Sequence, residues 1–359
     1  MSSIAPPAFN RLFKAVFISE TRINTLRKRV SQKLDPTYIA YGLIEKQAQG
    51  LTNYHPQAPS VWHAPAFAED PQSYSSVHIP LREDACSAYT LALYYRTKKK
   101  SEFAQAAGNI LHAWSSKLQV LRQNQASRLL FCQHFPTLIF ASDLLKNSPF
   151  WPRSAQNNFK TFLAQRAIEM DASDQPDLLG VWGLYLTMSI ALCLNDHVAF
   201  EKACDRWKEL LNSLWQKNGV LREKITPFKL ITSPLYLQHL VLTPMTLIAE
   251  MARVNGIDLF TYLGKEVHLK QLFEQTVFQT RNTLTGDEPR NIRKYAFEKD
   301  IFYFEILNAK WPNATCAELL RWYRPISSPY IPHLTFTHGN LAQDDYIQRK
   351  GSDSSLSLF

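Results

Sequence analysis

Apolar residues recur at a helical spacing through the middle of the chain, from residue 81 to about residue 275. Between residues 84 and 96, one face collects small and apolar side chains that lie three and four positions apart, as on neighbouring turns of an α-helix. This face consists of Ala85, Ala88, Leu91, Ala92 and Tyr95. Six later segments repeat the pattern, at residues 103–118, 135–146, 155–170, 182–196, 199–216 and 235–256. The pattern predicts an all-α protein built from antiparallel pairs of helices.

The stretches between these segments predict the limits of the domains. Residues 48–80 are rich in Pro, Ser, His and aromatic residues and lack a helical period, so they predict a long, lid-like loop. Pro136 is expected in the first turn of its helix, and short strands are expected at residues 219–225 and 333–338. The resulting division is a helical arm at 1–47, the loop at 48–80, a helical domain at 81–335 and a polar, disordered tail at 336–359.

The charge balance favours an acidic partner. The chain has 40 Lys and Arg residues against 31 Asp and Glu residues, for a formal net charge of +9. Such an excess suits a uronic acid polymer, a nucleic acid or an anionic membrane. Nucleic acid ranks low because no recognition motif is present, and no apolar stretch reaches the ~18 residues of a membrane span. Charges at Arg11, Lys14 and Glu20 interrupt any signal-peptide core, which predicts a cytoplasmic or non-classically exported protein.

The five cysteines are scattered along the chain and form no C-x-x-C pair. Such spacing does not indicate a metal centre or a disulfide framework, and it is typical of small buried residues on helices. The sequence therefore predicts neither a metal nor an organic cofactor.

Six stretches of the chain are informative because they occur together and in a fixed order. They are PLREDACSAYTLALYYR with AAGNILHAW, HFPTLIFASDLLKNSPFW, GVWGLYLTMSIALCLND, GVLREKI, LVLTPMTLIAEMARVNGIDLF and EKDIFYFEILNAKWPN, and they span roughly residues 60 to 330. In this order they resemble the alginate-lyase-like polysaccharide lyases. The resemblance implies an incomplete α/α toroid, acidic β-1,4-linked uronans as the substrate class, and cleavage by β-elimination.

β-Elimination removes the C5 proton beside a carboxylate and expels O4 of the next sugar, so the carboxylate needs a neutralising partner as negative charge develops. The resemblance implies that an Asn and a His or related residue ahead of a Gly-x-Trp motif hold the carboxylate, together with an Arg from a later loop. A Tyr at the start of the next long helix transfers protons. Here the motif lies at residues 180–183, and the residues before it are Asp177, Leu178 and Leu179. Leucine can neither donate to a carboxylate nor move a proton.

The downstream positions of the family pattern are substituted as well. With Pro244 held in register, Thr226 stands at the Arg position and Leu237 at the Tyr position. Polar residues close by could replace the lost groups after a shift of one residue. The candidate catalytic residues are therefore Arg222, Tyr236 and His239.

Six residues are candidates for binding the substrate. Trp182 suits a sugar-stacking platform and a helix-core aromatic equally well. His134, like His239, is a candidate polar contact or a histidine satisfied by its neighbours. Trp62 belongs to the aromatic residues of the predicted lid. The remaining candidates are Asp177, Glu223 and Gln238.

Two main functions fit this pattern. The first is a protein that binds an acidic polysaccharide or its fragments and cleaves it by β-elimination if the replacement residues are competent. The alternative is a catalytically inactive relative that keeps the scaffold as a carbohydrate-binding or structural module. Two further alternatives rank lower: nucleic-acid binding, and a glycoside hydrolase that would pair the carboxylates of Asp177 and Glu223.

Overall fold

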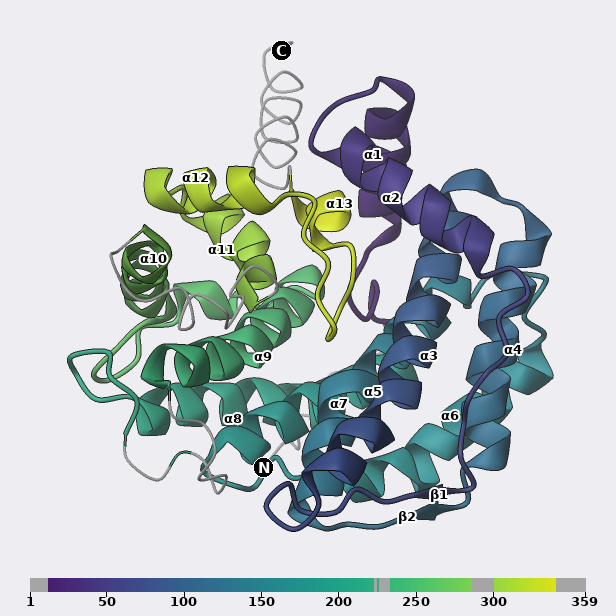
Figure 1. Cartoon of the computed structure of the whole chain (residues 1–359), viewed down its shortest axis with the longest axis horizontal. Helices are drawn as coiled ribbons and strands as arrows, with labels where there is room; N and C mark the ends of the chain where they lie inside the picture. The colour runs from purple at the N-terminus through teal and green to yellow at the C-terminus, as the bar shows by residue number, and fades with distance from the viewer. Residues whose placement is uncertain (1–11, 223–224, 226–232, 286–299, 340–359) are drawn as a thin grey trace, which may run out of the picture.

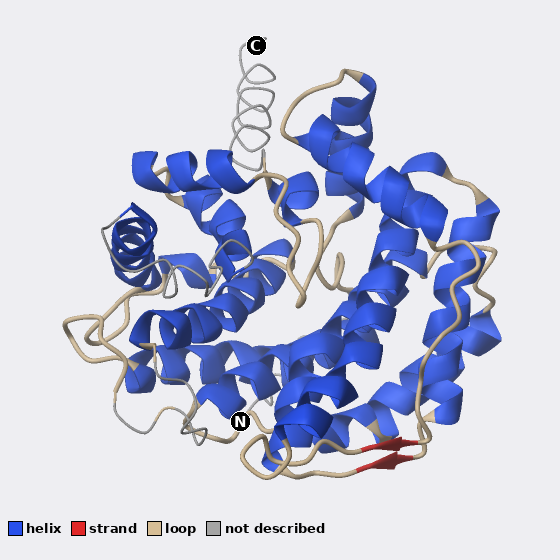
Figure 2. Ribbon diagram, viewed as in Figure 1, coloured by secondary structure: helices blue, strands red, loops and turns tan. Residues whose placement is uncertain are grey.

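The computed structural model describes residues 12–222, 225, 233–285 and 300–339. Helices dominate this part of the chain, and its strands are two residues long (Figure 2). The α-helices are α1 (Glu20–Ser31), α2 (Thr37–Gly50), α3 (Pro71–Lys98), α4 (Ser101–Lys117), α5 (Gln125–Leu145), α6 (Arg153–Gln165), α7 (Leu178–Leu194), α8 (His197–Leu214), α9 (Pro234–Val254), α10 (Leu269–Thr285), α11 (Phe304–Lys310), α12 (Ala314–Tyr323) and α13 (Leu334–His338). Short 3₁₀ helices are η1 (Ala167–Met170), η2 (Leu259–Thr261) and η3 (Asp300–Tyr303), and the parallel strands are β1 (Val61–Trp62) and β2 (Val120–Leu121).

Four long helices form the inner wall of an incomplete ring (Figure 1). Helix α3 packs on α5, α5 on α7, and α7 on α9, while the chain returns between them through α4, α6 and α8. Helices α3 and α5 run in the same direction. In their N-terminal halves, His78 of α3 stacks on His134 of α5 with ring centroids 5.7 Å apart. At their C-terminal ends, Arg96 of α3 donates to the backbone oxygen of Leu144 of α5 at 3.1 Å. The predicted all-α toroid is confirmed.

The inner position of α7 explains its composition. Its residues are apolar on nearly every side, and Trp182 and Tyr185 are both 0% exposed. A helix with this pattern is stable only when neighbours cover it all round, which α5, α8 and α9 do. Neither α7 nor any other helix in the described ranges is long and apolar enough to cross a membrane.

A C-terminal segment of residues 324–333, which we call the central segment, enters the ring after α12 (Figure 1). The backbone oxygen of Pro329 accepts a hydrogen bond from Nδ1 of His134 at 3.2 Å. His333 contacts Thr90 of α3 through Nε2 at 2.8 Å. Thr137 of α5 donates from Oγ1 to the backbone oxygen of Tyr330. The central segment therefore joins the inner walls and narrows the space between them.

The structure corrects the predicted loop at 48–80. Helix α2 continues to Gly50, and α3 begins at Pro71, so the connection between them is shorter than predicted. Asp70 caps α3 by accepting from the backbone N–H of Ser73 at 2.9 Å, and Pro71 occupies a first-turn position where no N–H is needed. Pro80 lies inside the helix.

Three further local predictions were wrong. Pro136 lies in the interior of α5, which begins eleven residues earlier at Gln125. Residues 333–338 form α13 rather than a strand. In the described part of residues 219–225, pairing is limited to a single bridge between Trp215 and Leu221. Of the predicted tail, residues 336–338 belong to α13, and residues 340–359 lie outside the described ranges.

Candidate functional site

The N-terminus of α7 carries the Gly-x-Trp-Gly motif and is capped by Asp177. The Asp177 carboxylate accepts from the backbone N–H of Gly180 at 3.1 Å, which satisfies one of the free donors at the helix start. The backbone N–H of Leu178 donates to the oxygen of Ile225 at 2.8 Å. The side chains of Leu178 and Leu179 are 0% and 3% exposed, so both belong to the core. Burial raises the pKa of Asp177.

The two glycines of this motif allow α7 to approach the preceding loop. A Cβ on Gly180 would lie 1.9 Å from the backbone oxygen of Gln175. One on Gly183 would lie 2.7 Å from backbone atoms of Ala172 and Ser173. Both distances are shorter than any van der Waals contact. The motif is therefore required for backbone packing, whatever chemistry takes place next to it.

Five rings converge where the N-terminal halves of the inner helices meet the central segment. His134 stacks on His78 at 5.7 Å and on Tyr330 at 5.6 Å, and Tyr74 lies 6.4 Å from His78. The Tyr330 and Tyr236 side chains lie close enough for each to influence the pKa of the other's hydroxyl. Tyr74, His78 and Tyr236 are only partly buried, so their side chains keep some exposure to solvent. We call these five residues the aromatic cluster.

The aromatic cluster is uncharged at neutral pH. Burial, with a smaller contribution from the Asp300 carboxylate, raises the pKa of Tyr236 to about 12. Burial lowers the pKa of His134 to about 3 and also lowers that of His78. The charge of Arg82, which follows His78 by one helical turn, lowers the pKa of both histidines further. Arg82 pairs with Glu83 at 3.8 Å, with both side chains partly exposed, and its positive charge lies next to neutral rings.

Trp182 lies beneath the aromatic cluster. It is 0% exposed, and its ring centroid is 4.9 Å from that of Tyr330. Its Nε1 is buried without a hydrogen-bond partner among the described residues. Because Tyr330 and Tyr185 pack against the indole, the structure favours the helix-core interpretation of Trp182 over an open stacking platform.

The three candidate catalytic residues are not brought together. His239 is 1% exposed, with Nε2 3.0 Å from Oγ1 of Thr280 and Nδ1 3.0 Å from the hydroxyl of Tyr303. Burial lowers its pKa to about 3, so it stays neutral and joins α9 to α10 and η3. Arg222 lies on the surface, 45% exposed, and pairs with Glu266 at 2.8 Å. Of the three, only Tyr236 belongs to the aromatic cluster.

Several predicted substrate contacts are structural in this conformation. Gln238 is 7% exposed and accepts from Nε1 of Trp215 at 3.1 Å. Trp62 is 1% exposed, and its Nε1 donates to the backbone oxygen of Ser127 at 2.9 Å. It packs in the core with Trp114 rather than on an open lid. Leu237 is half-buried. Glu223 and Thr226 lie outside the described residues.

His78, Arg82 and Tyr330 were missed by the sequence analysis. His78 and Arg82 follow Tyr74 at intervals of four residues on α3, a spacing that becomes visible only once the helix is known to begin at Pro71. Tyr330 stands between prolines in SPYIP, a pattern that marks an extended segment without indicating where it docks. Within the described ranges, no group of three or more His, Cys, Asp or Glu side chains could hold a metal ion.

The family model named Alginate lyase matches residues 50–285, which include the Gly-x-Trp-Gly motif and four of the five rings. The chain belongs to the alginate lyase family. No curated protein sequence matches it. Tyr330 of this alginate lyase family member lies outside the matched range and reaches the site through the central segment.

Solved structures support the same fold. Alginate lyase A1-III from Sphingomonas species A1 is 17% identical, with a TM-score of 0.67 over 93% of this chain and 99% of that one. An alginate lyase from Bacteroides ovatus is 12% identical, with a TM-score of 0.69 over 91% and 99% of the two chains. A tyrosine-to-phenylalanine variant of A1-III, complexed with tetrasaccharide, is 18% identical with a TM-score of 0.69, over 93% and 99%.

Proposed function

We propose that this member of the alginate lyase family binds an acidic polysaccharide at the aromatic cluster and does not cleave it by β-elimination. The observation that carries the proposal is the row of stacked rings beside Arg82. Partly exposed aromatic faces offer apolar contact to the faces of sugar rings, and a guanidinium binds a carboxylate through two parallel hydrogen bonds. A solved relative with the same fold is complexed with tetrasaccharide, which supports the substrate class.

The side chains next to the aromatic cluster support the proposal that the protein does not carry out elimination. Leu178 and Leu179 are buried and apolar, so they cannot hold the uronate carboxylate. Tyr236, with a pKa of about 12, keeps its proton at neutral pH and is a poor general base. The nitrogen Nδ1 of His134 donates a hydrogen bond to the backbone oxygen of Pro329. Burial lowers the pKa of His134 to about 3 and also lowers that of His78, so both imidazoles are weak bases for the C5 proton. In this proposal Arg82 binds the uronate carboxylate.

One observation favours a second candidate, an active lyase. Tyr236 lies in the first turn of α9 and is partly exposed, which is a suitable place for a residue that protonates a leaving oxygen. Under this alternative, replacing Tyr236 by Phe abolishes formation of unsaturated sugar. The hydrolase alternative is disfavoured because the Asp177 carboxylate caps α7.

Calorimetric titration with an oligouronate and with a neutral oligosaccharide of equal length tests the binding proposal. We expect saturable binding of the acidic ligand alone. Tyr74→Ala is expected to weaken it by about tenfold, which corresponds to ~1.4 kcal/mol. The matched control is Tyr38→Ala, because Tyr38 is 39% exposed on α2 and outside the aromatic cluster. Arg82→Ala is expected to weaken binding and Arg82→Lys to retain most of it. Equal affinity in Tyr74→Ala and Tyr38→Ala would refute the proposed site.

A further inference from the structure

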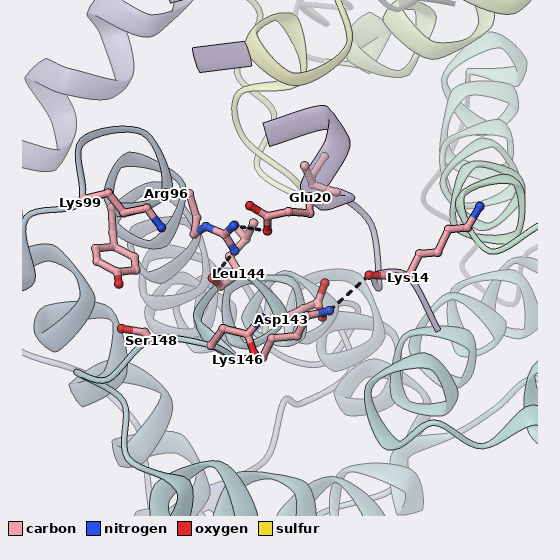
Figure 3. A pocket seen from close by; sticks show the side chains of 11 residues that line it. Lys14, Glu20, Arg96, Lys99, Asp143, Leu144, Lys146 and Ser148 are labelled. Atoms are coloured by element: carbon pink, nitrogen blue, oxygen red, sulfur yellow. Dashed lines mark hydrogen bonds and ion pairs between the residues drawn. The ribbon is translucent and has the colours of Figure 1, made fainter. Parts of the chain in front are cut away.

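A separate cavity lies at the opposite ends of the inner helices from the aromatic cluster. It has a volume of about 370 Å³ and forms where the chain before α1 crosses the C-terminal ends of α3 and α5 (Figure 3). Its charged lining comes from Glu20, Arg96, Lys99, Asp143 and Lys146. Lys14 also lines it, but its side chain points away from the other labelled residues in Figure 3. We call this cavity the end pocket.

Most of the charged groups in the end pocket already have partners. Arg96, whose side chain is 8% exposed, pairs with Glu20, and this hydrogen bond lowers the pKa of the Glu20 carboxyl. Lys146 pairs with Asp143 at 2.9 Å and donates to the backbone oxygen of Lys14 at 3.3 Å. These contacts pair the cations of Arg96 and Lys146 with the carboxylates of Glu20 and Asp143.

Two donors have no hydrogen-bond or ion-pair partner among the described residues. The Nε of Arg96 is buried and makes no hydrogen bond within the described ranges. The Lys99 ammonium lies 5.5 Å from the centre of the Tyr95 ring and has no carboxylate within ion-pair distance in the same ranges. Burial and the charges of Arg96 and Arg27 lower the pKa of Lys99. The end pocket therefore has an excess of positive charge that an anion would offset.

Helix ends explain only part of this charge. Cations are favoured at helix C-termini because the last carbonyl groups are unpaired. Arg27 binds such a carbonyl group at the end of α3, because its Nε donates to the backbone oxygen of Arg96 at 2.8 Å. Arg96 in turn donates to the backbone oxygen of Leu144 at the end of α5. Lys99 makes no such bond to a carbonyl group in the described ranges, although its backbone is held at φ 63° as the C-cap of α3. Its ammonium is therefore available to a ligand.

The mixture of charges indicates the chemistry of that ligand. The carboxylates of Glu20 and Asp143 are paired, but each can accept further hydrogen bonds, for which an inorganic anion such as sulfate has no donor. A hydroxylated acid offers both a carboxylate acceptor and hydroxyl donors. The volume lies at the small end of the range for ligand pockets. We propose that the end pocket binds one uronate unit of an acidic polysaccharide, with its carboxylate at Lys99 and its hydroxyls at Glu20 and Asp143.

This inference takes its substrate class from the proposed function but concerns a different place on the molecule. The test is calorimetric titration with a uronate trisaccharide, using a neutral trisaccharide and sodium sulfate as comparison ligands. We expect the wild type to show two independent sites and Lys99→Ala to retain one. Lys99→Arg is expected to retain both. The matched control is Lys100→Ala, because Lys100 is exposed like Lys99 and adjacent to it in sequence but lies outside the pocket lining.

The outcomes separate this inference from the proposed function. A single site that Tyr74→Ala removes and Lys99→Ala leaves unchanged would overturn the end pocket alone. A single site that Lys99→Ala removes and Tyr74→Ala leaves unchanged would support the end pocket and overturn binding at the aromatic cluster. Sulfate binding at Lys99 as tightly as the trisaccharide would overturn the assignment to uronate. Absence of any binding would overturn both proposals.

Discussion

Replacing Gly180 by Ala tests whether the Gly-x-Trp-Gly motif is a packing device. The added methyl group would lie 1.9 Å from the backbone oxygen of Gln175, so the loop or the helix must move by at least about 1 Å. Arg206 holds this loop through hydrogen bonds of 2.8, 3.0 and 3.0 Å to the backbone oxygens of Ser173, Asp174 and Gln175. Movement of the loop would weaken these bonds as well.

Two opposing effects determine how much Gly180→Ala changes the free energy of unfolding. Alanine in place of glycine inside a helix stabilises it by up to ~1 kcal/mol. Overpacking a core costs ~1–3 kcal/mol, and a clash with a tethered backbone belongs at the upper end of that range. We therefore expect Gly180→Ala to lower the free energy of unfolding by about 2 kcal/mol. Gly42 is the matched control: it is exposed on α2, and a Cβ there meets nothing within 4 Å.

Urea unfolding followed by tryptophan fluorescence and circular dichroism measures both variants. Gly42→Ala is expected to leave the free energy of unfolding unchanged or raise it by up to ~1 kcal/mol. The difference between the two variants should therefore be about 2–3 kcal/mol. A Gly180→Ala protein as stable as Gly42→Ala would show that the loop yields freely and that the packing argument is wrong.

Three further predictions concern other predicted site residues. Asp177→Ala should lower the free energy of unfolding by ~1 kcal/mol because α7 loses its cap. Asp177→Asn should keep most of the stability, because Asn also caps helices. Equal losses of stability for the two variants in urea unfolding would contradict the capping role. The folded-state pKa of His239, about 3, lies below its ordinary value of 6.5, so this histidine contributes stability above pH 6.5 that is lost as pH falls toward 3. The stability difference between wild type and His239→Gln should therefore shrink by ~1.4 kcal/mol per pH unit below pH 6, and a constant difference would exclude a buried neutral histidine. Arg222→Ala should change the free energy of unfolding by less than ~1 kcal/mol and leave oligouronate affinity unchanged, because its pair with Glu266 is exposed; a loss of affinity would return Arg222 to the binding site.

The inner helices were predictable from the sequence because burial imposes a local pattern. Each inner helix packs against neighbours along its length, so α5 and α9 are rich in apolar residues and α7 is apolar on nearly every side. The start of α3 was missed because prolines and serines hide the period. Asp70 followed by Pro71 is nevertheless a local signal for a capped helix start.

The aromatic cluster could be predicted only in part. Tyr74 and Tyr236 could be selected from local context, but their relation to Tyr330 depends on where the central segment docks. That docking rests on hydrogen bonds between residues nearly two hundred positions apart in the chain, such as His134 with Pro329. Trp62 was misplaced for the same reason, since it lies in β1 and its partner Ser127 lies in α5. Contacts at such separations leave no periodic pattern in a single sequence.

The most direct test of the central claim is ultraviolet absorbance of the unsaturated sugar that β-elimination produces, recorded while the purified protein is saturated with an acidic polysaccharide. Our account predicts a flat trace across a panel of uronans, including the polymer that calorimetry shows to be bound. A rise in absorbance that disappears in Tyr236→Phe would contradict it and would assign this chain to the active lyases, with Tyr236 as the residue that transfers the proton.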